Sequence, residues 1–307
     1  MWFKNIRLYQ FTRPFTLSVD ELEQKLSEFV FQPCSSFERS RFGWVSPLGK
    51  DEEALTHSVG HYVMVCARKD EKLLPASVVN DAVMEKVEEL EARQSRKVHR
   101  KEKLQIKDDV TAALLPRAFS RTRKVFAYID RQAGLLVINT SSASAAEELI
   151  SGLRECLGSM PVVPADVQQA PDSVMTGWLQ AHVADGQFEI SENCELVNPA
   201  EDGNSIRCSG QDLTAGEISM HLAAGKQVRK LGVVWNQSLS CVLSDDLTIS
   251  RLRFEDMILE KAQEADAETA AQQFDQDFAV MTLSLSGLFN ALFDVFGGAR
   301  THEAQNP

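Results

Sequence analysis

Alternating apolar and polar positions predict several β-strands along the chain. Residues 3–11 and 61–69 alternate in the way of half-buried strands. Residues 124–140 contain two such runs around a turn at residues 132–134, which predicts a hairpin. Three further strands are expected in the second half of the chain, at residues 226–236, 238–245 and 248–254.

Helical spacing of apolar residues predicts helices that open with recognisable caps. In a capping box, a Ser or Thr is followed three residues later by Glu, and the two residues satisfy each other's backbone N–H groups. The chain has three such pairs ahead of apolar repeats: Ser18 with Glu21, Ser144 with Glu147, and Thr214 with Glu217. Gly158 lies where the second of these helices is expected to end.

The middle of the chain predicts a projecting helical arm at residues 77–116. An apolar stripe runs through Val79, Val83 and Val87, but the sequence becomes almost entirely charged after Leu90. A helix that is polar all round projects into solvent or bridges two bodies. We therefore expect one helix over residues 78–103, about 40 Å long at about 1.5 Å per residue.

A second helix is expected directly after this arm. Asp108 or Asp109 would cap its beginning, and Pro116 would end or kink it because proline lacks a backbone N–H. The last predicted helix of the chain carries an apolar stripe that is strong enough for burial against another domain or another subunit. The stripe consists of Phe274, Phe278, Met281, Leu285, Leu288, Leu292 and Phe296.

These elements predict the α+β class, with mixed antiparallel sheets, long projecting helices and two or more sub-domains. A length of 307 residues favours about two domains. The proline-rich residues 159–171 are the preferred boundary. We expect an N-terminal α+β domain at residues 1–165 and a C-terminal α+β domain with the terminal helix at residues 166–307.

Charge is distributed unevenly along the chain. The formal net charge is −12, yet residues 93–124 hold eleven Lys and Arg against three Asp and Glu, a local balance of +8. The rest of the chain therefore carries about −20. Such segregation indicates one positive working surface on a body that otherwise repels polyanions.

Basic residues of this kind suit phosphate groups, which need only positive charge and hydrogen-bond donors. The alternative is that charged helix faces are simply solvated, and this alternative is stronger for the arm than for residues 117–124. The candidate DNA-binding cations are Lys97, Arg100, Lys101, Arg117, Arg121, Arg123, Lys124, Lys226, Arg229 and Lys230.

Phe119 lies within the basic stretch and has three interpretations. It could be a core aromatic behind the turn at Pro116, or an anchor in a subunit interface, where aromatics and arginines are enriched. Stacking on a nucleic-acid base is the third alternative.

Enzyme motifs are missing from the sequence. It contains no phosphate-binding GxxxxGK[ST], no GxGxxG after a strand, no HExxH and no CxxC. His57 and His61 could approach each other, but two histidines leave a zinc site short of ligands. We expect no enzyme activity, no cofactor and no metal, and we expect a cytoplasmic protein because no run approaches the roughly 18 apolar residues of a membrane span.

Several ordered motifs resemble one known family. They include "WFKN" at residues 2–5, "FGWVSPLGK" at 42–50, "LLPRAFSR" at 114–121, "PVVP" at 161–164 and "DLTAGEI" at 212–218. The segments "AGKQVRKL" at 224–231 and "FDQDFAVMT" at 274–282 extend the match nearly to the end of the chain. Together they resemble the RdgC recombination-associated protein family.

The resemblance implies a ring-shaped homodimer with duplex DNA in a positively lined central hole. It implies binding with little sequence preference, antagonism of the RecA recombinase, no enzymatic activity and an association with the nucleoid. The alternative is an interaction protein that inhibits RecA by direct contact, with DNA binding secondary.

The matched motifs carry family roles onto particular residues. "LLPRAFSR" places the aromatic of the ring-closing dimer contact on Phe119, and "QDLT" places a DNA-facing polar residue on Gln211. Gly210 precedes this glutamine where the family pattern can have a basic residue. Lys226 and Lys230 match basic positions of the family.

Overall fold

Two antiparallel β-sheets organise the chain, and a computed structural model describes residues 1–200, 203–263 and 267–300 of it. The seven-stranded first sheet has the order β2-β4-β5-β6-β1-β7, with β3 also paired to β4. Its strands are β1 (Arg7–Phe11), β2 (Ser40–Val45), β3 (Thr56–Val59), β4 (Tyr62–Leu73), β5 (Phe119–Asp130), β6 (Leu135–Ile138) and β7 (Val162–Pro164).

The five-stranded second sheet has the order β12-β11-β10-β8-β9. Its strands are β8 (Phe188–Val197), β9 (Ser205–Ser209), β10 (Gln227–Trp235), β11 (Leu239–Ser244) and β12 (Ile249–Phe254). The three strands expected at residues 226–254 are thus confirmed, and so is the β5–β6 hairpin. Strand β8 was not predicted, because three consecutive polar residues, Ser191, Glu192 and Asn193, break the alternation of its apolar positions.

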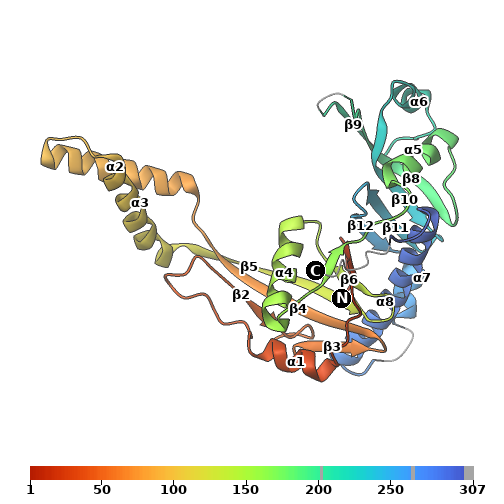
Figure 1. Cartoon of the computed structure of the whole chain (residues 1–307), viewed down its shortest axis with the longest axis horizontal. Coiled ribbons are helices and arrows are strands. Elements are labelled where there is room, and N and C mark those ends of the chain that lie inside the picture. The colour runs from red at the N-terminus through yellow and green to blue at the C-terminus, as the bar shows by residue number, and fades with distance from the viewer. Residues whose placement is uncertain (201–202, 264–266, 301–307) are drawn as a thin grey trace.

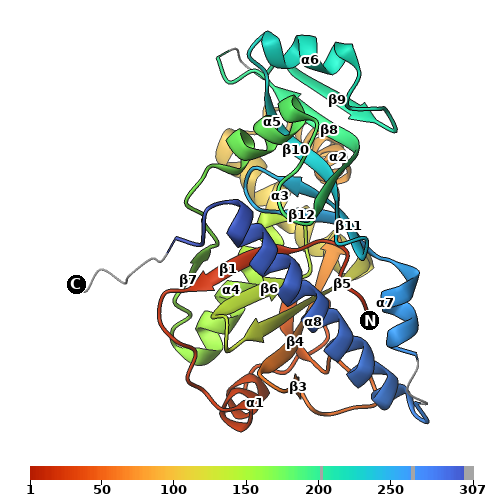
Figure 2. The same ribbon diagram turned by 90° about the vertical axis from the view of Figure 1, so that its right-hand side faces the viewer.

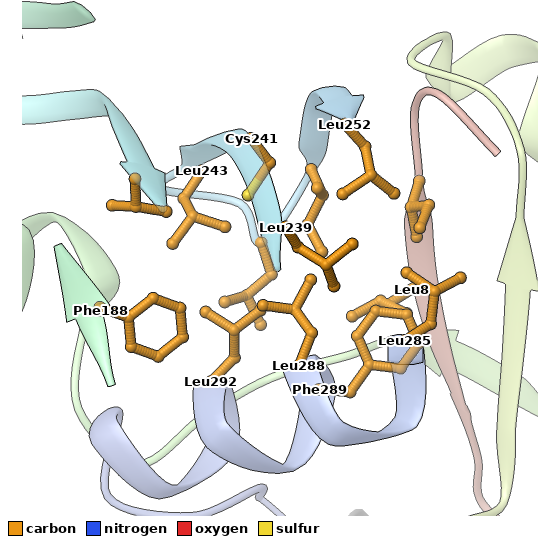
Figure 3. Packing of buried hydrophobic residues seen from close by; sticks show 14 of the residues in the cluster. Leu8, Phe188, Leu239, Cys241, Leu243, Leu252, Leu285, Leu288, Phe289 and Leu292 are labelled. Carbon is orange, nitrogen blue, oxygen red and sulfur yellow. The ribbon is translucent and has the colours of Figure 1, made fainter. Parts of the chain in front are cut away.

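Helix α8 (Ala270–Val295) joins the two sheets through one hydrophobic core. In Figure 2 it runs diagonally across the first sheet and reaches the second. Figure 3 shows Leu285, Leu288 and Leu292 of α8 facing strands of the second sheet, with Leu8 of β1 in the same layer. The apolar stripe expected for the terminal helix is therefore buried within the chain itself.

The expectation that no segment is long and apolar enough to cross a membrane is wrong for α8, the single helix in the described part of the chain that meets this criterion by length and composition. Its burial between the sheets is what the core helix of a globular protein shows. A second link between the sheets lies nearby, because Ile6 exchanges both backbone hydrogen bonds with Ile249 of β12 (2.7 and 3.0 Å). The predicted strand at residues 3–11 accordingly begins in one sheet and continues in the other.

Helices α1 (Val19–Ser27) and α4 (Ala143–Leu157) cover the opposite face of the first sheet. The capping box of Ser18 and Glu21 is confirmed, since both of its hydrogen bonds are present. The box predicted at Ser144 is wrong: the N-cap of α4 is Ser142, whose hydroxyl accepts from the Ala145 N–H. Gly158 ends the helix in the left-handed region, with φ of 78°.

The arm is a hairpin of two helices rather than one long rod. Helix α2 (Ala76–Gln94) ends at Ser95, whose φ of 50° turns the chain, and α3 (Arg100–Leu114) runs back beside it. The expected continuous helix over residues 78–103 and the cap at Asp108 or Asp109 are therefore wrong. Helix α3 ends before Pro116, as expected, and a short 3-10 helix (Leu115–Arg117) follows it.

Three short helices complete the second half: α5 (Pro171–Ala181), α6 (Gly216–Ala223) and α7 (Asp256–Lys261). The third predicted capping box is wrong, because the N-cap of α6 is Ala215. The Thr214 hydroxyl instead donates to Asp212 (2.7 Å), and Glu217 accepts from the Gln211 side chain (3.0 Å).

The α+β class with antiparallel sheets is confirmed. In Figure 1 the helical arm projects from one end of the first sheet and the second sheet lies at the other end, which gives the chain an open, curved outline. The predicted boundary near residue 165 falls between β7 and α5 and stays a prediction.

Candidate nucleic-acid interface

The outer halves of β4 and β5 form a charged two-stranded ribbon that leads from the first sheet to the arm (Figure 1). In this ribbon Lys69 lies opposite Arg123, and Glu71 lies opposite Arg121. Val125 is two positions further along β5 and packs in the core that α4 covers, so these four side chains share the α4 face of the sheet. They line a hollow of about 360 Å³ together with Ser144, Ala145 and Glu148 of α4.

Cations outnumber carboxylates in this hollow by three to two. Lys69 forms an ion pair with Glu148 across the hollow. Arg123 donates to the Thr140 hydroxyl (3.2 Å), and neither Arg121 nor Arg123 has a carboxylate within ion-pair distance among the described residues. Two exposed guanidinium groups thus remain available to an anion.

The other face of the ribbon carries Arg68, Lys72 and Lys124 against a single carboxylate, Asp70. Arg68 holds Asp70 with two hydrogen bonds of 3.0 Å, and Thr122 donates to the same carboxylate. Burial acts to raise the pKa of Asp70, but these hydrogen bonds outweigh it and the pKa lies below its ordinary value. Lys124 is exposed opposite Arg68.

Phe119 begins β5 at the base of the arm, and its side chain is 84% exposed. The core-aromatic interpretation is therefore wrong. Leu73 lies directly opposite and is 48% exposed, so the two residues form an apolar pair beside the basic ribbon. Arg117 precedes this pair in the short 3-10 helix.

The cations predicted on the arm lie at its far end. Lys97, Arg100 and Lys101 surround the turn between α2 and α3, and α3 spans about 22 Å from there to its end at about 1.5 Å per residue. Arg96 makes a two-pronged ion pair with Glu102 (2.7 and 2.9 Å). The hydrogen bonds from Arg96 lower the pKa of Glu102 to about 2.

The basic cluster predicted in the second half is only partly available. Lys226 is buried, and its ammonium group donates to the Asn204 carbonyl (3.2 Å), which leaves little of it to meet a ligand. Arg229 is exposed on β10, whereas Lys230 binds Glu195 (3.2 Å). Gln211 is half-buried and donates to Glu217.

Within one chain the predicted cations therefore form three separate groups: the arm tip, the β4–β5 ribbon and the second sheet. The sequence analysis missed Arg68 and Lys69 beside β5, and Arg207, Arg251 and Arg253 on the second sheet. A signal for the last two was present, because Arg-Leu-Arg in a predicted strand places both arginines on one face.

The two histidines considered as metal ligands lie against different carboxylates. His57 Nε2 lies 3.3 Å from Asp275 of α8, and His61 Nε2 lies 3.6 Å from Asp130. Across residues 1–200, 203–263 and 267–300, no group of three or more His, Cys, Asp or Glu side chains could hold a metal ion.

Comparison with known proteins gives a consistent match over nearly the whole chain. The family model described as "Putative exonuclease, RdgC" matches residues 1–299. The chain is 45% identical to the "Recombination-associated protein RdgC" of Pseudomonas putida (strain GB-1) over 299 residues, 97% of this chain and 98% of that protein. The protein of the same name in Tolumonas auensis is 43% identical, and the match covers 98% of this chain and 99% of that protein. The one in Aeromonas hydrophila is 44% identical, and the match covers 97% of this chain and 98% of that protein. The chain therefore belongs to the RdgC family.

Proposed function

We propose that this protein binds double-stranded DNA without sequence preference, that two copies close around the duplex, and that this binding restrains RecA-dependent recombination. Membership of a family whose curated members are named recombination-associated proteins supports the general role. The observation that carries the DNA-binding part is the β4–β5 ribbon, where Arg121 and Arg123 are exposed without carboxylate partners among the described residues.

The uneven charge of the chain supports a confined DNA-binding surface. A body with a net charge of −12 repels a polyanion over most of its surface, so a duplex is drawn to the few places where cations prevail. Guanidinium and ammonium groups on strands reach phosphate oxygens, which are the same for every base sequence. Contacts of this kind position the duplex without recognising its base sequence.

Closure by two copies is supported by the apolar pair of Phe119 and Leu73. An exposed aromatic next to arginines is typical of the centre of a subunit interface. The pair lies at the base of the arm, and the arm and the second sheet occupy the two ends of a curved outline (Figure 1). Two such outlines that meet at their ends would enclose a space between them.

A salt titration tests the electrostatic part of this proposal. Binding to duplexes of unrelated sequence should weaken with a log–log slope of about −0.9 for each phosphate that the protein neutralises. Equal affinity for the unrelated duplexes is expected. A flat salt response, or binding to one duplex and not to another, would refute it.

Closure needs a separate measurement. Protein loaded on a covalently closed circle should resist a salt wash that strips it from a linear duplex with free ends. Equal retention on both would refute encirclement while leaving DNA binding intact.

The alternative function is inhibition of RecA by direct contact. Mixing the two proteins without DNA separates the hypotheses, because co-elution favours direct contact. The family description also names an exonuclease. Incubation of the protein with end-labelled DNA and Mg²⁺ or Mn²⁺ tests this, and loss of label would refute our proposal that the protein is not an enzyme. We further propose that it is cytoplasmic and associated with the nucleoid.

A further inference from the structure

The second sheet has one buried face and one open face. Its buried face packs on α5, α6 and α8 through residues such as Leu231 and Leu239. The opposite face contains two adjoining hollows of about 410 and 310 Å³, which share Asn193, Val242 and Arg251. We call these two hollows together the open-face groove. Its polar side chains include Ser191, Ser209, Ser240 and Ser250.

Three side chains form a charged ladder across the open-face groove. Glu195 of β8 lies opposite Arg207 of β9 and opposite Lys230 of β10. Its carboxylate binds both cations, at 3.3 and 3.2 Å, while Arg207 keeps 75% of its side chain exposed. Burial acts to raise the pKa of Glu195, but Lys230 and Arg207 outweigh it and the pKa lies below its ordinary value. The Glu195 carboxylate thus holds two cations in place, and the three side chains together keep a net charge of +1.

Two further arginines extend the positive charge to the far edge of the sheet. Arg251 and Arg253 are exposed on β12 and have no ion-pair partner among the described residues. A β-bulge between Ser240 and Val242 of β11 interrupts the pairing here, and Arg251 has a φ of 53°. Left-handed backbone is unfavourable for arginine, and such strain is retained where surrounding structure enforces it. The bulge therefore sets the direction of this side chain.

We propose that the open-face groove binds the phosphate backbone of duplex DNA through Arg207, Arg251 and Arg253. This inference rests on the function proposed above and adds a contact surface distinct from the β4–β5 ribbon. The groove carries four cations and one carboxylate, so its net charge is positive on an acidic protein. Serine and asparagine side chains between the cations supply the neutral donors that phosphate oxygens also accept.

The lining of the groove favours backbone contact over base contact. Among the described residues no aromatic side chain lines either hollow, so the groove lacks the rings on which single-stranded bases stack. Arg207 lies on one edge strand and Arg251 and Arg253 on the other. Four strand spacings of about 4.8 Å separate the two edges, so the cations span about 19 Å. A duplex presents about one phosphate per 1.7 Å of axis, which provides partners over that whole width.

The triple variant Arg207→Gln/Arg251→Gln/Arg253→Gln tests the groove. Each change removes charge from an exposed side chain, and Lys230 remains to pair the buried carboxylate of Glu195. The matched control Arg13→Gln/Lys50→Gln/Lys261→Gln removes three exposed cations outside the groove. Affinity for a duplex is measured for both proteins and for the wild type between about 50 and 200 mM salt, the range over which phosphate binding weakens steeply, with circular dichroism and molecular size as checks.

The groove variant should have a salt dependence shallower by about 0.9 for each phosphate that it no longer neutralises, or about 2.7 for three phosphates. Its affinity deficit relative to the wild type should then shrink by about 40-fold between the two salt concentrations. The control should keep the wild-type slope. If the triple variant does not fold, Arg207→Gln/Arg253→Gln leaves the strained Arg251 in place and should give about two-thirds of the change in slope.

The possible outcomes separate the two proposals. A wild type that does not bind duplex overturns the proposed function and this inference with it. A wild type that binds, with a groove variant of unchanged slope, overturns the groove alone. A groove variant that loses wild-type molecular size also overturns it, because the face would then be an interface between copies of the chain.

Discussion

Replacement of Phe119 by serine should separate self-association from folding. The side chain is 84% exposed in the single chain, so its removal costs the fold little. Surface substitutions away from special backbone or buried polar groups usually change the free energy of unfolding by less than about 0.5 kcal/mol. We expect the thermal unfolding midpoint of a dissociated sample to stay at its wild-type value.

The cost to a subunit interface should be much larger. An aromatic side chain buries about 150–250 Å², of which 84% is accessible here. At about 25 cal/mol per Å², complete burial in an interface would contribute about 3–5 kcal/mol at most. Interface anchors typically lose about 2 kcal/mol or more on truncation. We therefore expect self-association to weaken by about 2–4 kcal/mol, which is about 30- to 700-fold.

Sedimentation equilibrium over a range of protein concentrations measures this change directly. Leu283→Ser is the matched control, since Leu283 is 65% exposed on α8 and lies outside the arm. Restraint of RecA should fall in Phe119→Ser and remain in the control. Unchanged association in Phe119→Ser would refute the interface role, and a large loss of secondary structure would refute the claim that this side chain is dispensable for folding.

Three further predictions concern the fold and its charges. Leu285→Ala should lower the free energy of unfolding by about 2.7–5.0 kcal/mol, because this residue is fully buried. Urea unfolding measured by circular dichroism and by fluorescence should still show one coincident transition, because Leu285 lies in the core that both sheets share. Gly43→Ala should lower the free energy of unfolding by about 1–3 kcal/mol or more in the same assay, because a Cβ there would lie 2.4 Å from the Phe31 Cα. Glu195 has a lowered pKa in the fold, so its stabilising effect is present above its unfolded value of about 4.3 and is lost as the pH falls below that. Glu195→Gln should therefore flatten the acid side of the stability curve measured by urea unfolding between about pH 3 and 7.

Periodic patterns in the sequence were sufficient for the strands and helices that bury one face. The β5–β6 hairpin, the three strands of residues 226–254 and the stripe of α8 all have the expected positions. Caps were less predictable. Ser142 and Ser144 are equally good cap residues by composition, and only the first has its hydroxyl placed to accept from the helix.

The turn of the arm could not be predicted because its signals are weak ones. Ser95 adopts a left-handed backbone without being Gly or Asn, and His99 precedes a capping-box Glu102 although histidine is not a preferred cap residue. Pairing of α2 with α3 depends on a small core of Val79, Val83 and Val110, which are spread over a sequence of 32 residues, half of them charged.

The site could be predicted where basic residues are close together in the sequence. It could not be predicted where strand pairing brings together residues that are far apart in the sequence. Arg121 and Arg123 stand out because four basic residues occur within eight positions. Lys69 joins them only through the β4–β5 register, and Arg207 meets Glu195 only through the β8–β9 register. The exposure of Phe119 likewise depends on the position at which the arm leaves the sheet. That position cannot be predicted from the neighbouring sequence.

The hydrophobic core that α8 shares with both sheets also determines which parts of the chain resist bending relative to each other. Bending between the two sheets would pull apart a layer that includes Leu8, Leu239 and Leu285, and each such residue removed from packing costs several kcal/mol. The arm is held by a far smaller apolar cluster, and it joins the body through only two strands of the described chain. We therefore expect bending to be concentrated at the end that carries Phe119, while the two sheets keep their relative positions.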